Sequence, residues 1–162
     1  MVGEIFSEDA KTKVRAWLME DGWSLRQESG AQVAWVFVAE DRLHRKLVVG
    51  QNTGREDMLV IQGAVALDEE MTNRVEQLSE KQRNDFLWDL RFELVRTDLE
   101  FSGVQIPLKR VEVSERIFFD ALTKDTFLQR ASQVRKGVII VQWMLARRFA
   151  QQPPKKELGF QR

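Results

Sequence analysis

Apolar residues near the start of the chain recur at the spacing of an α-helix. One face of such a helix would consist of Ala10, Val14, Trp17 and Leu18. Ser7 is a suitable N-terminal cap, and the acidic residues that follow it are favoured at the positive end of a helix. Gly22 can adopt the left-handed conformation that ends many helices. The pattern therefore predicts a first helix between Ser7 and Gly22.

From residue 24 to residue 67 the pattern changes to the alternation that is typical of β-strands. It predicts strands at 24–28, 31–39, 43–49 and 58–67. Segment 31–39 is apolar on both faces, which is typical of a central strand covered on both sides or of a strand at an interface. His44 is expected to face solvent from the third strand. The connections are too short for helical crossovers, so these strands are predicted to form an antiparallel meander.

Helical spacing returns in the middle of the chain. Residues 68–78 predict a short helix, and Ser79 with Gln82 forms a capping-box pattern at the start of a second helix. The apolar stripe of this second helix consists of Phe86, Leu87, Leu90 and Leu94. Ser102 and Gly103 then interrupt the pattern, so the helix is expected to end before them.

The last third of the chain predicts a strand region followed by a long helix. Residues 104–119 alternate as in a strand, and Pro107, which has no N–H to donate, is expected at an edge or a bulge. Thr123 is expected to cap the final helix, whose apolar stripe continues to Phe149. The Gln-Gln-Pro-Pro sequence at 151–154 ends that helix. Residues 153–162 are expected to form a flexible basic tail.

These elements predict an α+β fold in the order α-β-β-β-α-β-β-α, in which helices flank an antiparallel sheet as a two-layer sandwich. The pattern leaves open whether the first run has three or four strands. It also leaves open whether one or two helices, and then one or two strands, follow that run. A chain of 162 residues, 43% of them hydrophobic, can bury one core. We therefore expect a single domain over residues 1–152.

The composition excludes several classes of functional site. The chain has no cysteine, which rules out disulfides, thiolate zinc sites, iron–sulfur clusters and cysteine nucleophiles. His44 is the only histidine, and neither a phosphate-binding glycine loop nor a nucleophile elbow is present. No apolar run approaches the ~20 residues of a membrane span, and no secretory signal is visible. We expect a cytoplasmic protein that is not an enzyme and has no catalytic, cofactor-binding or metal-binding residues.

Four short motifs resemble segments of a known superfamily. They are Leu-Ser-Glu-Lys-Gln-Arg at 78–83, Phe-Leu-Trp-Asp-Leu at 86–90, Glu-Val-Ser-Glu-Arg-Ile at 112–117 and Leu-Thr-Lys-Asp-Thr-Phe at 122–127. They are similar to the mid-chain helix, the late strand and the start of the final helix in the type III secretion chaperone-like superfamily. This superfamily includes the YbjN-like proteins and small archaeal families of unknown function. The resemblance spans residues 5–150 and implies the fold order given above and often a dimer, but no activity and no catalytic residue.

Charge is unevenly distributed along a chain whose total is zero, with 25 Lys and Arg against 25 Asp and Glu. Acidic residues predominate up to Gly103, whereas after Asp125 the only acidic residue is Glu157. One interpretation is an anionic partner, such as RNA, DNA or an acidic protein patch. The other is that the acidic half pairs with the basic half, within the fold or across a dimer. The basic residues concerned are Arg130, Arg135, Lys136, Arg147, Arg148, Lys155 and Lys156.

The final helix has more apolar residues than one face of a sheet can cover. It is either sandwiched between the sheet and other helices or located in an oligomer interface. Trp35, Val36 and Val38 offer a second apolar surface, on the sheet, unless they belong to the core. The candidate partner-binding residues on the final helix and tail are Val138, Ile140, Trp143, Met144, Arg147, Arg148, Lys155 and Lys156.

Asp85, Asp89 and Glu93 share one helix face, where they form either a divalent-cation site or a solvated surface. Since nothing else in the sequence points to a reaction, we expect a non-enzymatic protein-binding or chaperone-like module. Such a module would dock a partner segment on its sheet and C-terminal helix, and a homodimer is among the expected assemblies. The alternative is a ribosome- or nucleic-acid-associated factor that uses the basic C-terminal helix and tail. No cofactor and no membrane partner are expected.

Overall fold

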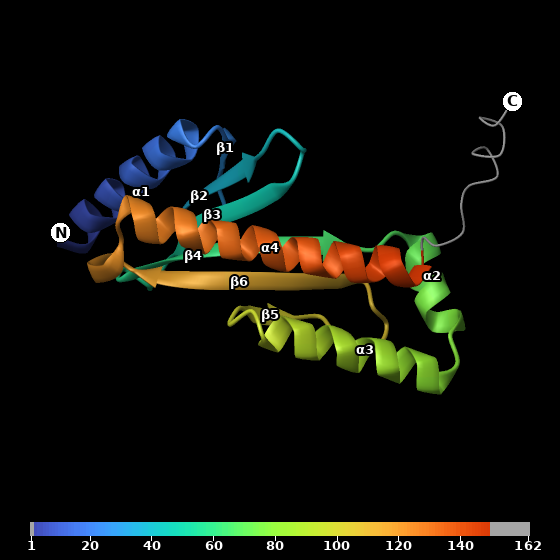
Figure 1. Ribbon diagram of the computed structural model, residues 1–162. Coiled ribbons are helices and arrows are strands. Elements are labelled where there is room, and N and C mark those ends of the chain that lie inside the picture. The colour runs from blue at the N-terminus through green and yellow to red at the C-terminus, as the bar shows by residue number, and fades with distance from the viewer. Residues whose placement is uncertain (1, 150–162) are drawn as a thin grey trace, which may run out of the picture.

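The computed structural model describes residues 2–149 of the chain, and the side chains of residues 7–149 (Figure 1). The helices are α1 (Val2–Glu20), α2 (Glu69–Gln77), α3 (Glu80–Val95) and α4 (Lys124–Phe149), with a short 3₁₀ turn at Phe119–Ala121. The strands are β1 (Ser24–Glu28), β2 (Val33–Glu40), β3 (Lys46–Asn52), β4 (Met58–Ala66), β5 (Glu100–Ser102) and β6 (Arg110–Phe118).

The strands form one six-stranded sheet with the order β1-β2-β3-β4-β6-β5, and every neighbouring pair is antiparallel. The α+β class, the antiparallel sheet and the order of elements are therefore confirmed. The first run has four strands and the middle of the chain has two helices, which resolves the counts that the sequence left open.

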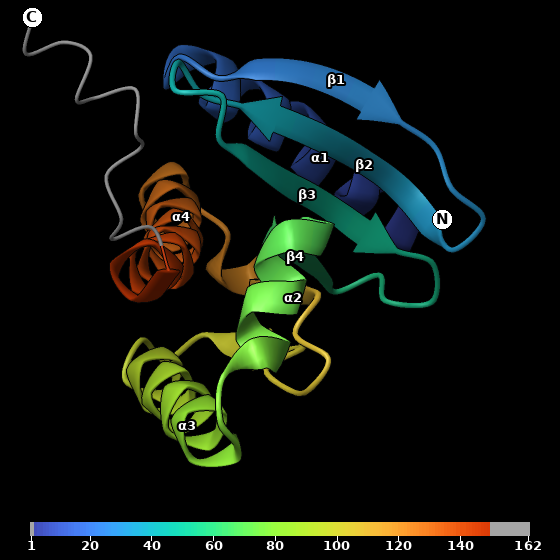
Figure 2. The ribbon, with the colours of Figure 1, turned by 90° about the vertical axis from the view of Figure 1, so that its right-hand side faces the viewer.

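The helices α1 and α4 cover one face of the sheet (Figures 1 and 2). Helix α4 packs across β3, β4 and β6, while α1 packs on β1, β2 and the side of α4. Helix α3 lies alongside α4 at the β5 edge of the sheet, as Figure 2 shows. The core lies between sheet and helices, and Trp35 belongs to it. On the opposite face of β2, Val36 and Val38 are half-buried, so this strand is buried on only one side.

Several helix ends depend on local hydrogen bonds that the sequence had indicated. After α1, Gly22 has a φ of 90° and the Trp23 N–H donates to the Leu18 carbonyl at 3.0 Å, which ends the helix as expected. At the start of α3, the Ser79 hydroxyl and the Gln82 side chain bond to each other's backbone N–H at 3.2 and 3.3 Å. This reciprocal pair is a capping box.

The expected cap at Ser7 is wrong, because α1 begins at Val2 and Ser7 lies inside the helix. The Ser7 hydroxyl instead donates to the Gln51 side-chain oxygen at 2.8 Å. The indole N–H of Trp35 donates to the same oxygen at 2.9 Å, and the Gln51 amide donates to the Arg55 carbonyl at 3.1 Å. Gln51 is thus a buried amide whose bonds join α1, β2 and the β3–β4 turn.

Replacing Gln51 with methionine is expected to lower the free energy of unfolding by about 1–3 kcal/mol. The substitution keeps the side-chain length but leaves the Trp35 indole N–H buried without its acceptor. Urea unfolding followed by tryptophan fluorescence measures the change. Ser7→Ala is the matched control, since it removes only a donor and leaves the bond between Trp35 and Gln51 in place. Equal unfolding midpoints for the two variants would contradict the role assigned to Gln51.

Two expected strands begin later than the sequence indicated. Residues 43–45 form a turn, in which the Asp41 carboxylate accepts the N–H groups of Leu43 and Arg45 at 2.8 and 2.9 Å. His44 therefore lies in this turn with a φ of 61°, and not in a strand. This turn closes the β2–β3 hairpin, so β3 begins only at Lys46.

The strand expected over 104–119 is also shorter, since β6 begins at Arg110. Two backbone carbonyls of the preceding loop accept hydrogen bonds from helices. The carbonyl of Val104 accepts from Arg91 of α3 at 2.9 Å, and that of Leu108 accepts from Thr72 of α2 at 3.3 Å. The break expected at Ser102 contains the short strand β5.

Candidate protein-binding groove

Helix α4 divides its apolar residues between the sheet and the surface. Val134, Val138 and Val141 are buried, and a Cβ added at Gly63 of β4 would lie 2.5 Å from Val138 Cγ2. Val138 is therefore a core residue that fits closely on the sheet, which corrects its place among the partner-binding candidates. Ile140 and Met144 are only partly buried, and Trp143 is 70% exposed.

A groove runs between α3 and α4 on the outside of the molecule. Its larger hollow has a volume of about 640 Å³ and is lined by Asp89, Phe92, Glu93, Arg96, Ile140, Trp143, Met144 and Arg147. A second hollow of about 250 Å³ shares Asp89, Met144 and Arg147 with the first and adds Gln82, Asp85, Phe86 and Arg148. We call the two together the α3–α4 groove. It collects five of the eight residues predicted on α4 and the tail: Ile140, Trp143, Met144 and Arg147 line the first hollow, and Arg148 lines the second.

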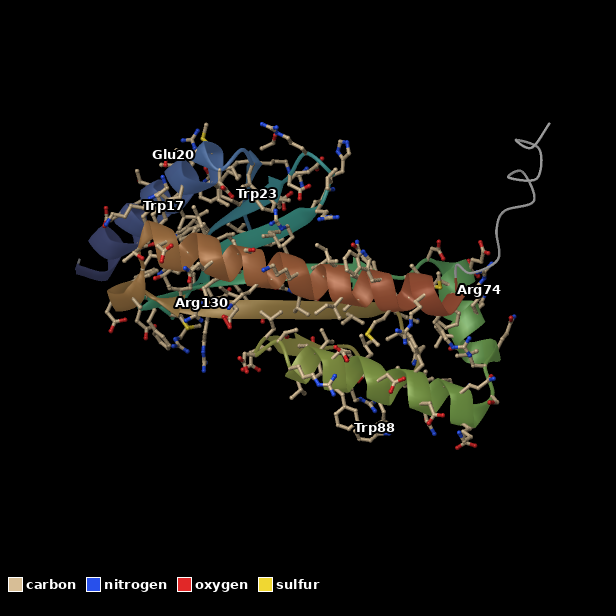
Figure 3. All side chains as sticks on the ribbon, in the orientation of Figure 1. Trp17, Glu20, Trp23, Arg74, Trp88 and Arg130 are labelled. Atoms are coloured by element: carbon tan, nitrogen blue, oxygen red, sulfur yellow. The ribbon has the colours of Figure 1, made fainter. Side chains whose placement is uncertain are left out.

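Helix α3 supplies the other wall because it is apolar on two sides. Its inner stripe of Phe86, Leu87, Leu90 and Leu94 is buried, as the sequence indicated. Its outer stripe consists of Trp88, Phe92 and Val95, all more than half exposed. The Trp88 and Phe92 rings are 5.8 Å apart, and the Arg91 guanidinium lies 4.8 Å from the Trp88 ring. Trp88 points away from α4, so Phe92 is the aromatic residue of this stripe that reaches the groove (Figure 3).

The sequence analysis missed this outer stripe. Its signal was present, since residues 88, 92 and 95 have the i, i+4, i+7 spacing of a second helical face. The acidic residues Asp85, Asp89 and Glu93 lie between the two stripes and line the groove.

Charges of both signs surround the groove. Arg96 pairs with Glu93 at 2.6 Å and Lys81 pairs with Asp85 at 3.1 Å. Asp89 and Arg147 form no ion pair with any other residue of the described part of the chain. Both therefore keep their charge available to a partner.

Other basic residues of the C-terminal half pair with acidic residues from the first half or from β6. Arg130 pairs with the largely buried Glu115 at 2.8 Å, and Lys124 pairs with Glu20 at 2.7 Å (Figure 3). Only the pair of Lys124 and Glu20 joins the basic part of the chain to the acidic part, because Glu115 belongs to the same C-terminal part as Arg130. Lys155 and Lys156 lie outside the described residues.

Among the side chains of residues 7–149, no three acidic or histidine groups lie close enough together to hold a metal ion. A hydrogen bond from Arg55 lowers the pKa of the Asp57 carboxyl, which is exposed in the β3–β4 turn and does not line the groove. None of the helices in the described range combines the length and apolar character that a bilayer-spanning helix needs. The chemistry of the groove is thus that of a mixed apolar and charged surface.

Comparison with known proteins places the chain in a family. Residues 10–145 match the family described as "Uncharacterized conserved protein (DUF2299)". The chain belongs to this family. The match covers the whole sheet and most of α4, but Arg147, Arg148 and the residues after them lie outside it. No curated protein matches the chain.

A solved structure has the same fold. It is described as an uncharacterized protein from Methanothermobacter thermautotrophicus and is 27% identical, with a TM-score of 0.81. The superposition covers 86% of this chain and 99% of the archaeal one. The expected similarity to an archaeal family of unknown function is thus confirmed. Neither description mentions a secretion chaperone. The similarity to the type III secretion chaperone-like superfamily therefore remains a proposal.

Proposed function

We propose that this chain is a non-enzymatic protein-binding module that docks an apolar segment of a partner protein in the α3–α4 groove. The observation that carries the proposal is the pair of exposed aromatic side chains on either side of the groove, Phe92 and Trp143. Large exposed aromatic side chains that line a hollow mark interaction sites more often than isolated surface residues do. Tryptophan is also among the residues that contribute most to binding energy at protein interfaces.

The proposed docking surface is the space between α3 and α4 and not the sheet face under α4. The sheet face under α4 is filled by core residues such as Val134 and Val138, so it offers no room to a partner. Burial of apolar side chains beside Phe92, Trp143 and Met144 would supply affinity. Asp89 and Arg147 would steer the partner and set its register.

A chaperone-like role in the cytoplasm fits this module, since a chaperone of the resembled superfamily shields partner segments and performs no chemistry. A nucleic-acid partner fits less well, because Asp85, Asp89 and Glu93 face the same groove as Arg147 and would repel phosphates.

Short random peptides displayed on phage, selected against the full-length chain, test the proposal. We expect selected peptides to carry apolar side chains and to lose about 30-fold in affinity for Trp143→Ser, as for a residue central to an interface. Phe92→Ser should act in the same direction. The measurement is fluorescence anisotropy of labelled peptides.

Leu43→Ser is the matched control, because Leu43 is an equally exposed apolar residue (68%) in the β2–β3 turn, away from the groove. Its peptide affinities should equal those of the unmodified chain. The proposal is wrong if no peptide is enriched, or if enriched peptides bind Trp143→Ser and Phe92→Ser as well as they bind the Leu43 control.

A further inference from the structure

The α3–α4 groove lies beside the point where the described part of the chain ends. The ring of Phe149 packs edge-on against Phe86, which lines the second hollow, with 5.5 Å between centroids. Arg74 of α2 donates to the Phe149 carbonyl at 2.8 Å, and Figure 3 shows Arg74 at this end of α4. Phe149, the last residue that the structure describes, is therefore held at one end of the groove by two specific contacts.

The sequence after this tether is complementary to the groove. Residues 153–162 read Pro-Pro-Lys-Lys-Glu-Leu-Gly-Phe-Gln-Arg. Leu158 and Phe160 are two positions apart, so in an extended segment both point to the same side. The groove offers apolar partners in Phe92, Trp143 and Met144.

The charges of this segment also match those of the groove. The basic residues Lys155 and Lys156 would face the acidic wall of the groove, which contains Asp85 and Asp89. Glu157, the single acidic residue of the segment, would face the basic residue Arg147. Opposite charges at these positions favour encounter and register.

The length of the segment suits the groove. The lining residues of the α3 wall, from Gln82 to Arg96, extend over about 20 Å at the rise of an α-helix. Six extended residues, 155–160, cover about 17–20 Å. The two consecutive prolines before them are incompatible with a continued helix, which allows the chain to reverse its direction there.

We propose that residues 153–162 of this chain occupy the α3–α4 groove, with Leu158 and Phe160 against its aromatic side chains. This inference rests on the proposed function, because it makes the segment an intramolecular competitor of the partner. A short tether gives the segment an effective concentration in the millimolar range. The competition should therefore be modest and should weaken a partner peptide by about two- to five-fold.

Because the chain has no cysteine, Arg162→Cys provides a unique site for a nitroxide spin label. In the full-length labelled chain, we expect selective broadening of the Trp143 indole N–H signal, which a Trp143→Phe variant assigns. The Trp23 indole, located at the α1 end of the molecule, is the internal reference (Figure 3). Substituting Leu158→Ser and Phe160→Ser in the labelled chain should remove most of the broadening. Equal broadening in the two labelled chains, or none at Trp143, would overturn the inference.

A mixture of isotope-labelled, cysteine-free chain with unlabelled, spin-labelled chain separates docking within one molecule from docking between two. Intramolecular docking predicts no broadening in this mixture. Broadening of the same size would show that a second copy supplies the segment, which contradicts the inference as stated.

The peptides selected for the proposed function provide the second readout. They should bind about two- to five-fold more tightly to the chain that carries Leu158→Ser and Phe160→Ser than to the unmodified chain. Equal binding would reject the competitor role while the proposed function stands. Peptide affinities that Trp143→Ser leaves unchanged would contradict the proposed function. The spin-label result would still show where residues 153–162 lie.

Discussion

Substituting alanine for Phe127 is expected to lower the free energy of unfolding by about 3–5 kcal/mol. Phe127 is fully buried in the first turns of α4, and its ring lies 5.9 Å from that of Trp17 on α1. Its removal leaves a cavity where α1, α4 and the sheet meet, and the surrounding rigid elements can close only part of it. Urea unfolding, followed by circular dichroism and by tryptophan fluorescence, measures the loss.

Phe92→Ala is the matched control for this prediction, since it is the same substitution at a helical position that is 56% exposed. We expect a change in unfolding free energy of within about 0.5 kcal/mol, because surface substitutions leave little cavity and alanine favours helix. The same variant should weaken the selected peptides. A large stability loss in Phe92→Ala would mean that the outer stripe of α3 serves the fold and not a partner.

Gly103→Ala is expected to destabilise the protein by about 3 kcal/mol. Gly103 has a φ of 87°, in the left-handed region that costs other residues about 1–2 kcal/mol. In addition, a Cβ at this position would overlap the backbone carbonyl of Arg110, which cannot move without disturbing β6. Steric overlap with backbone in a packed region typically costs a further ~1–3 kcal/mol. The measurement is the midpoint of thermal and urea unfolding.

Gly54→Ala separates the two causes. Gly54 has nearly the same φ, 85°, but nothing lies within 4 Å of a Cβ added there. This control should therefore lose only the conformational part, about 1–2 kcal/mol. If the two variants unfold at the same urea concentration, the close approach of Gly103 to Arg110 contributes nothing to the stability of the fold.

Gly103 also affects the position of the α3 wall of the groove. The residue after it, Val104, accepts the hydrogen bond from Arg91 that ties α3 to the loop before β6. A displaced loop would move this carbonyl and loosen the α3 wall. In Gly103→Ala we therefore expect weaker peptide binding even at temperatures where the chain remains folded, whereas Gly54→Ala should bind normally.

Features that depend on a few consecutive residues could be predicted from the sequence. Gly22 ends α1, Ser79 with Gln82 begins α3, and Thr123 accepts the Thr126 N–H at 3.1 Å at the start of α4. The apolar segments 31–39 and 58–67 indicated the strands β2 and β4, each of which has one face in the core. On α4, the surplus of apolar residues left two alternatives, burial between the sheet and other helices or an oligomer interface. In the structure, Ile140, Trp143 and Met144 line the groove.

Features that depend on a distant partner could not be predicted. Ser7 looked like a cap, yet its hydroxyl bonds to Gln51, which lies 44 positions further along the chain. The carbonyl groups of residues 104 and 108 are used by α3 and α2, so the sheet begins only at Arg110. In each case the local pattern allowed two arrangements, and a contact between remote elements selected one of them.

The same division applies to the groove. Sequence alone determined that α3 and α4 are helices with more apolar residues than a single stripe requires, since helical periodicity is a property of neighbouring positions. Only the tertiary structure decided that these two helices lie side by side, that Val138 faces the sheet and that Phe92 faces Trp143 across a hollow with charged walls. The physical reason is that a helix presents all its faces equally until packing covers some of them, and packing is decided by the whole chain.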